Sequence, residues 1–369
     1  MQIVEFTGDS LRFSDALPTA APSTGFVWVF LDREDFAQHQ DQLQRAAQTL
    51  GGSQLLDLHC KDLSNPAHPS HYDYTSVYDM VIFRRLATPA EASSDDNAAP
   101  LKPGIPAFRH IRSRAVGFAI FDRLLISVHP PGCYTAKSFI ERFLADAKLS
   151  VDANAGRNRI PSSPADLVLR MVNTMVDSYL DVRKDLAAQL DHWQSELLKP
   201  HTRFNDWNTL MAARSQLHVL EDLCDEQHDA MQEWLDSLRE QPMATFDADH
   251  QLAHAKRDLL VARARDVIEH IERVMHHARR LEQSAETVVQ VHFSAQSNRT
   301  NDIMRTLTAI TAVFLPLNLI TGFFGMNFEV FPILHRPNAL WWTMGTMVGI
   351  AALLGVIFWR KRYLARTGR

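Results

Sequence analysis

A segment near the C-terminus carries polar side chains at regular positions in an otherwise apolar sequence. The positions are three or four residues apart, which places them on one face of a helix. They are Asn301, Met304, Thr308, Thr311, Leu315, Asn318 and Gly322. An asparagine amide in hydrocarbon costs free energy unless it faces a hydrogen-bonding partner or a water-filled cavity. This face therefore either packs against other helices, as Thr, Asn and Gly do in membrane interfaces, or lines an aqueous path.

If the face lines a path, several copies of the chain must form a ring, because two membrane spans cannot enclose water by themselves. Met304, Leu307 and Leu315 would then be apolar constrictions that close the path by excluding water. Packing between helices explains the same residues without a pore. The face alone does not separate the two hypotheses.

Two other groups of residues have types and spacing suited to chemistry. Gly325-Met326-Asn327 follows the polar face directly and carries no charge; Gly and Asn tolerate the left-handed conformation that ends helices. His250 and His254 are four residues apart, a helical spacing that can bind Zn²⁺. No third ligand accompanies the two histidines, so a solvated helix face is the simpler explanation for them.

The composition narrows the class of protein. The chain has 369 residues and a net charge of −5, which argues against a nucleic-acid-binding protein. Its three cysteines lie far apart, which indicates a reducing compartment and no disulfide framework. The sequence contains no HExxH motif, no glycine-rich phosphate loop and no nucleophile–base motif, so we expect no enzymatic activity.

The polar face belongs to the first of two uncharged segments. Thr306–Phe328 and Ala339–Trp359 contain no charged residue, and each is long enough to cross a hydrocarbon core of about 30 Å as a helix. The tail that follows, Arg360–Arg369, is rich in Lys and Arg, whereas the connecting loop holds only Glu329 and Arg336 as fixed charges. The positive-inside rule therefore predicts cytoplasmic termini and a short external loop.

The sequence before these spans predicts an α/β domain followed by helices. Strands are expected at Gly25–Asp32, Val77–Leu86, Arg114–Phe121 and Arg123–Pro130, a helix at Glu34–Leu50, and a disordered loop at Thr88–Pro106. Two helices are then expected, at Ser163–Leu198 and Asn205–Arg239.

A third helix is expected to begin at Asp249 and to continue into the first span, because no proline or glycine interrupts it before Pro316. Its small and apolar residues alternate in steps of four and three, as in helices that pack on one another. They are Leu260, Ala264, Val267, Ile271, Val274, Ala278, Leu281, Ala285 and Val288. Stalk and span would form one rod on the order of 110 Å long. An antiparallel hairpin core explains the same stripe.

The segment Thr300–Phe328 resembles the CorA group of divalent-cation channels. The resemblance depends on Gly325-Met326-Asn327 at the end of the penultimate span, the entry Asn301-x-x-Met304, a proline within the span, and the short loop, second span and basic tail that follow. It implies a homopentameric funnel in which the first span lines a pore, with Asn301, Met304, Leu307, Thr308, Thr311, Leu315, Asn318 and Gly322 on the pore-lining face.

By the same resemblance, Gly325, Met326 and Asn327 form the outer selectivity filter, with Asn327 as the side-chain acceptor and Gly325 setting the backbone. Mg²⁺ sheds its waters reluctantly, so a neutral ring of amide and backbone oxygens can hold the hydrated ion. Carboxylates would bind it tightly, whereas conduction needs weak sites. The family's regulatory cation sites are matched by Asp266 in the stalk and Asp62 in the N-terminal domain, which would meet across a subunit interface.

The external loop is less acidic than in many members of the group, since Glu329 is its only acid. A zinc-transporting branch, the ZntB-like proteins, shares this feature. We expect a channel-like transporter of Mg²⁺, with Co²⁺ and Ni²⁺, in which Mg²⁺ is both substrate and regulatory ligand and no cofactor is bound. The alternatives are a ZntB-like zinc transporter and, in another class, a non-transporting membrane-anchored scaffold or sensor.

The expected fold is an α+β membrane protein of the cell (inner) membrane. Its parts are a cytoplasmic α/β domain (1–150), antiparallel cytoplasmic helices (151–245), a stalk helix (246–304), a pore-lining transmembrane helix (305–327), an external loop (328–338), a second transmembrane helix (339–359) and a basic cytoplasmic tail (360–369). Its partners are divalent cations, the lipid membrane and copies of itself.

Overall fold

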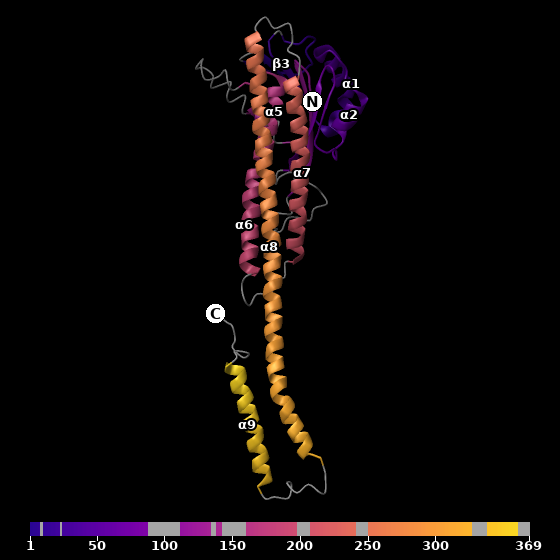
Figure 1. Cartoon of the computed structure of the whole chain (residues 1–369). Coiled ribbons are helices and arrows are strands. Elements are labelled where there is room, and N and C mark those ends of the chain that lie inside the picture. Colours follow the sequence, from indigo (N-terminus) through magenta and orange to yellow (C-terminus); the bar gives the residue numbers. More distant parts are fainter. Residues whose placement is uncertain are drawn as a thin grey trace. The chain divides into compact units, whose positions relative to one another are not determined.

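The computed structural model describes residues 1–7, 10–22, 24–87, 111–133, 138–141, 160–197, 207–240, 250–326 and 338–360. The chain forms two compact units, Met1–Glu286 and Thr287–Arg369. The expected loop at 88–106 lies outside the described residues. Figure 1 shows the whole chain with its elements labelled.

The first unit contains a seven-stranded sheet in the order β2-β1-β3-β7-β6-β5-β4. The strands are β1 (Gln2–Thr7), β2 (Ser10–Ser14), β3 (Phe26–Asp32), β4 (His71–Tyr74), β5 (Asp79–Leu86), β6 (Ser113–Ile120) and β7 (Leu124–His129). Only β3 and β7 pair in parallel among these strands, with Val27 opposite Leu124. The four predicted strands are confirmed as β3, β5, β6 and β7.

Both faces of the sheet are buried. Val27, Val29 and Leu31 point into a core shared with α1 (Phe36–Ala46), the π-helical turn η2 (Ala47–Gly51) and α2 (Asp57–Ser64). The intervening Trp28 is fully buried, and its indole Nε1 donates a hydrogen bond to Ser127 Oγ at 2.8 Å. A strand buried on both faces needs a continuous apolar run, which explains why β3 was recognisable in the sequence.

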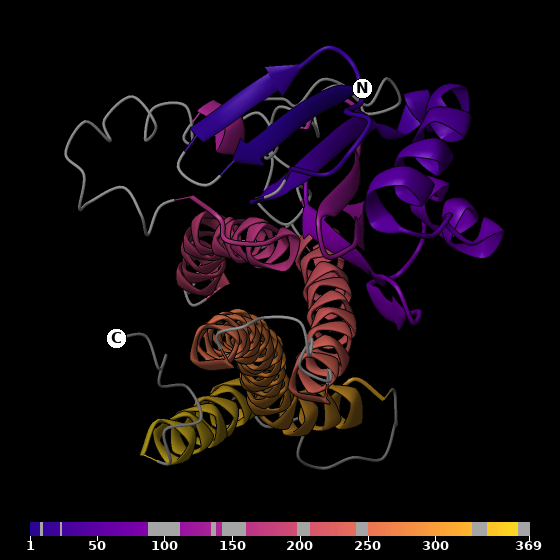
Figure 2. The same cartoon turned by 90° about the horizontal axis from the view of Figure 1, so that it is seen from above.

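Helices cover the two faces. Figure 2 shows α1 and α2 on one side of the sheet, and α5 (Pro164–Asp177) and α7 (Trp207–Glu240) on the other, where they contact β4, β5 and β6. The predicted helix at Glu34–Leu50 is confirmed as a short 3₁₀ turn, η1 (Arg33–Asp35), followed by α1 and η2. This helix ends at Gly52, which adopts the left-handed conformation with φ 85° that terminates helices.

Gly25, immediately before β3, is required by its surroundings. Its φ of 101° lies in the left-handed region, and a Cβ at this position would overlap the carbonyl oxygen of Phe6 on the neighbouring strand β1. Only glycine combines this backbone conformation with such close approach of two strands.

The single helix predicted for Ser163–Leu198 is wrong. The structure has two helices, α5 and α6 (Tyr179–Leu197), separated at Ser178. The Ser178 hydroxyl donates to the carbonyl oxygen of Met175 at 2.6 Å, and such local side-chain bonds compete with helical hydrogen bonding. No Pro or Gly marks the break, so the sequence pattern did not reveal it. The following helix α7 begins and ends within two residues of its prediction.

The last two helices are α8 (His250–Phe324) and α9 (Ala339–Arg360). The prediction that the stalk continues into the first apolar segment is confirmed, since α8 is one helix of 75 residues. Much of its predicted stripe is buried within the chain itself. The buried positions are Ala264, Val267, Ile271, Ala278, Leu281, Ala285 and Val288. In the first unit, which includes the buried positions from Ala264 to Ala285, the stripe therefore acts as the core of the helical layer.

Candidate functional site

The candidate site begins where α8 ends. The amide of Gly325 donates to the carbonyl oxygen of Thr321 at 2.9 Å, and the amide of Met326 donates to that of Phe323 at 3.4 Å. A Cβ on Gly325 would lie 2.9 Å from the Thr321 oxygen, closer than side chains normally approach a backbone oxygen. The described part of the tripeptide is therefore a tight turn that only glycine fits without a backbone shift. Asn327 and Glu329 lie outside the described residues.

The predicted pore-lining face is exposed along its whole length in the single chain. Asn301, Met304, Leu307, Thr308, Thr311, Leu315, Asn318 and Gly322 are all exposed. A Cβ built on Gly322 would meet no atom within 4 Å. No described residue of the chain covers this face.

The polar side chains on this face differ in whether their own helix supplies a hydrogen-bond partner. The hydroxyl of Thr308 donates to the carbonyl oxygen of Met304 at 2.8 Å, and the hydroxyl of Thr311 donates to that of Leu307 at 2.9 Å. Both threonines are thus satisfied by their own helix and tolerate an apolar environment. The side-chain amides of Asn301 and Asn318 make no hydrogen bond to any described residue. These two amides therefore need partners other than the described residues, such as water or another molecule.

The uncharged end of α8 and the helix α9 are apolar, and little of either is buried. Two helices are long and apolar enough to cross a membrane, His254–Phe324 and Leu340–Arg360, each with a window of mean hydropathy 1.8. None of the window in the second helix is buried, and Trp341, Trp342 and Trp359 are more than 70% exposed. Apolar surface of this extent is not left in water, and these helices fit membrane spans.

The two acids proposed for regulation lie on different helices of the first unit. Asp62 is on α2, 3.6 Å from Nε2 of His68, and its side chain is 22% exposed. Asp266 is on α8 and 59% exposed, and its Oδ1 lies 3.8 Å from Nε2 of His270. Within one chain each acid is beside a histidine rather than beside the other acid.

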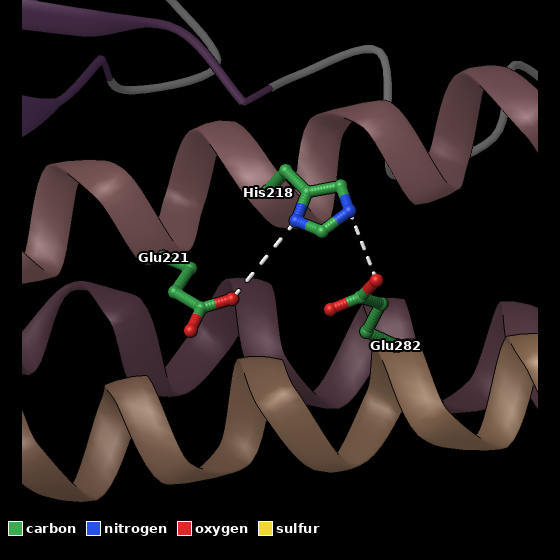
Figure 3. Close-up of side chains that lie close together, drawn as sticks. All are labelled: His218, Glu221 and Glu282. Atoms are coloured by element: carbon green, nitrogen blue, oxygen red, sulfur yellow. Dashed lines mark ion pairs between the residues drawn. The ribbon is translucent and has the colours of Figure 1, made fainter.

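The structure also brings together three residues that the sequence did not single out as a set. His218 and Glu221 on α7 face Glu282 on α8, and Figure 3 shows the imidazole between the two carboxylates. The contact between α7 and α8 depends on how two distant helices pack, which no local spacing reveals. The histidine pair noted in the sequence does not form a described metal site. His254 is exposed, and the side chain of His250 is not among those described.

Other stalk histidines line a cavity of about 60 Å³ between α5, α6, α7 and α8. His270 and His277 share its wall with Arg183 and Arg273. Burial lowers the pKa of His277, and the neighbouring cations Arg183 and Arg280 lower it further. This imidazole therefore favours the neutral form.

Comparison with known proteins agrees with this arrangement. A family model described as "CorA-like Mg2+ transporter protein" matches residues 23–362. The cobalt/magnesium transport protein CorA of Thermotoga maritima is 24% identical over 209 residues, which is 56% of this chain and 55% of that protein. The match thus spans about half the length of that relative.

Two solved structures show the same fold. The CorA magnesium transporter of Methanocaldococcus jannaschii superposes with a TM-score of 0.68 at 15% identity, covering 98% of each chain. The ZntB cytoplasmic domain of Vibrio parahaemolyticus superposes with a TM-score of 0.51 at 14% identity, covering 82% of this chain and 98% of that domain. These similarities confirm an N-terminal α/β domain, a long helix and two C-terminal apolar helices. Because the family model matches residues 23–362, nearly the whole of this chain, the chain belongs to the CorA-like Mg²⁺ transporter family.

Proposed function

We propose that the chain is a channel-like transporter that moves divalent cations, Mg²⁺ together with Co²⁺ and Ni²⁺, across the cell membrane. The observation that carries this proposal is the exposed face of α8, on which the side-chain amides of Asn301 and Asn318 have no hydrogen-bond partner among the described residues. Relatives in the family are named as cobalt/magnesium or magnesium transport proteins. The protein acts in this proposal as a transporter and not as an enzyme.

The aqueous path requires a ring of copies, and we propose a homopentameric funnel. In this assembly the α8 faces surround the path, so Asn301 and Asn318 meet water or ions instead of lipid. Met304, Leu307 and Leu315 narrow the path between them. The termini are cytoplasmic and residues 328–338 are outside, as the basic tail after α9 indicates.

Selection takes place at the outer end, at Gly325, Met326 and Asn327 of each copy. The tight turn at Gly325, whose amide donates to the carbonyl oxygen of Thr321, sets the backbone at this end, and Asn327 adds a neutral acceptor. Neutral oxygens bind the hydrated Mg²⁺ weakly enough to release it. Glu329 nearby attracts cations to the entrance. The membrane potential, worth about 2.3 kcal/mol per charge per 100 mV, drives inward movement.

Regulation involves Asp62 and Asp266 of neighbouring copies, which bind Mg²⁺ between them when it is plentiful inside and so favour closure. The exposure of Asp266 supports this role, because 59% of its side chain is free to meet a partner. Asp266→Ala is expected to relieve inhibition by high internal Mg²⁺. Inhibition that persists unchanged in this variant would refute the regulatory site.

The function is tested by cation uptake into liposomes that contain the purified protein. Mg²⁺, Co²⁺, Ni²⁺ and Zn²⁺ are compared, with and without a pH gradient, for the natural chain and for Asn327→Ala. We expect uptake of Mg²⁺, Co²⁺ and Ni²⁺ without a pH gradient and its loss in the variant. Equal flux in both proteins would favour a membrane-anchored scaffold or sensor instead.

A ZntB-like zinc transporter is the second candidate. It is favoured by the sparsely charged outer segment, with Glu329 as the only acid between residues 328 and 338. The likeness to the ZntB domain concerns the fold alone. Uptake of Zn²⁺ that exceeds Mg²⁺ uptake, or that requires a pH gradient, would decide for this alternative.

A further inference from the structure

Helices α7 and α8 of the first unit are joined by a ladder of charged contacts. The helices run antiparallel, and each contact pairs a basic residue of one helix with an acidic residue of the other. The pairs are Arg214–Glu286 at 4.0 Å, His218–Glu282 at 2.9 Å, Glu221–Arg279, and His228–Glu272 at 3.5 Å. The ladder fixes the register of the two helices along one shared face.

One step of this ladder has a carboxylate at each imidazole nitrogen. Nε2 of His218 lies 2.9 Å from Oε1 of Glu282, and Nδ1 lies 4.0 Å from Oε2 of Glu221. One ligand atom from each of the three residues lies within 4.8 Å of the other two (Figure 3). The two carboxylates are about 20% exposed and His218 is 53% exposed, so the group is held by the helices but open to solvent.

The neighbouring arginines hold the carboxylates in place and leave a charge surplus. Arg279 contacts Oε1 of Glu221, which turns the other oxygen toward His218, and Nε of Arg214 lies 3.5 Å from Oε1 of Glu282. The full network contains two guanidinium groups and four carboxylates, Glu221, Asp225, Glu282 and Glu286. The carboxylates therefore outnumber the guanidinium groups by two, a surplus that balances the charge of one divalent cation.

The donor set points to a particular class of ion. One imidazole nitrogen with carboxylate oxygens suits Zn²⁺, Co²⁺ and Ni²⁺, whereas Mg²⁺ prefers oxygen donors alone. The ligand atoms of one ion lie about 2.0–2.2 Å from it and therefore up to roughly 4 Å from one another. Small rotations of the three side chains would bring their ligand atoms to these distances. We propose that one divalent ion of the class of Zn²⁺, Co²⁺ and Ni²⁺ is bound by His218, Glu221 and Glu282. This ion would cross-link α7 to α8. This site is separate from the α8 face and does not depend on the proposed transport.

The test measures metal binding to the full chain in detergent, by calorimetry with Zn²⁺ and by absorption with Co²⁺, in a large excess of Mg²⁺. We expect His218→Gln to weaken Zn²⁺ binding at this site at least tenfold and to remove the rise in melting temperature that Zn²⁺ produces. His228→Gln is the matched control, because it alters the same kind of α7–α8 contact without touching the three ligands. It is expected to bind Zn²⁺ as the natural chain does.

A further variant separates loss of a ligand from loss of structure. His218→Cys replaces the imidazole with another ligand for these ions and is expected to retain Co²⁺ binding with added sulfur-to-cobalt absorption in the near ultraviolet. Equal Zn²⁺ binding by His218→Gln and the natural chain would overturn the proposal. So would displacement of Zn²⁺ by excess Mg²⁺. Neither result depends on whether the protein conducts ions, so failure of the transport proposal is recorded by the liposome experiment alone.

Discussion

The two units of the chain bury their large side chains very differently. In Met1–Glu286, Trp28 and Trp234 are fully buried, and most charged groups between the helices have partners of opposite sign. In Thr287–Arg369, Trp342 is 78% exposed and Leu319 is 74% exposed. The first unit gains its core within one chain. The second must gain its stability from contacts outside it, which in our proposal are lipid and copies of α8.

The sharpest contrast is between two tryptophans. Trp28→Ala removes a fully buried indole that also donates to Ser127, and we expect the first unit to lose about 3–5 kcal/mol of unfolding free energy. Trp342→Ala, at an exposed position of α9, is expected to leave that free energy unchanged. Chemical unfolding of both variants in detergent, followed by circular dichroism, checks the difference. An equal loss in both would mean that the two units do not unfold independently.

The next largest effect is expected at a buried charge in the first unit. Asp166 on α5 is fully buried and pairs with Arg170 at 3.0 Å and with Arg263 on α8 at 2.8 Å. Asp166→Ala removes the carboxylate that pairs with both guanidinium groups and accepts from the amide of Ser162. Because these arginines remain partly exposed, we expect a loss of about 2–3 kcal/mol. Thermal unfolding measures it, with Asp236→Ala, at an exposed pair with Arg239, as the control that should lose little.

In the second unit the comparison turns on two glycines. A Cβ at Gly325 meets the Thr321 oxygen of its own chain, whereas a Cβ at Gly322 has no described atom within 4 Å. Gly325→Ala is expected to lower Mg²⁺ uptake at least about tenfold, equivalent to about 1.4 kcal/mol. An effect of Gly322→Ala is expected only from the neighbouring copies of the proposed ring. Uptake into liposomes measures both variants, and full activity of Gly325→Ala would exclude a role for the turn.

A smaller difference is expected between the two kinds of polar residue on the α8 face. Asn318→Leu removes an amide without a partner among the described residues and should lower Mg²⁺ uptake about fivefold. Thr311→Val removes a hydroxyl that is already bonded to its own helix, so uptake should change less than about twofold. The same uptake assay compares them. If Thr311→Val were the more harmful, the face would serve helix packing rather than conduction.

The smallest effect concerns pH and belongs to the first unit. Burial and two nearby arginines lower the pKa of His277 below its ordinary value of 6.5. As the pH falls below 6.5, His277 of the unfolded chain takes up a proton, whereas His277 of the folded chain resists protonation. The contribution of the neutral imidazole to the free energy of unfolding is therefore present above pH 6.5 and is lost as the pH falls toward the lowered pKa of the folded chain. His277→Gln should reduce the loss of melting temperature between about pH 7.5 and pH 5.5 by under about 2 °C. An unchanged pH profile would exclude His277 as a cause.

The features that could be predicted from the sequence are those that depend on the local spacing of apolar and polar residues. The uncharged runs predicted the two apolar helices, and the steps of three and four predicted that α8 continues from stalk to span. The break at Ser178 was missed because serine is not a strong helix breaker. Strands β2 and β4 were missed because they have only five and four residues, and β1 and α2 were not predicted either. The His218 group was missed because Glu282 lies on another helix. The roles of the tripeptide, the α8 face, Asp62 and Asp266 remain predictions.

The central claim is that the exposed face of α8 is covered by copies of the same chain. Native mass spectrometry of the purified protein, released from lipid nanodiscs under mild conditions, tests it directly. The account predicts a dominant species with five times the mass of one chain. A single chain as the only species in lipid would contradict it, because one copy cannot enclose the path that Asn301 and Asn318 are proposed to line.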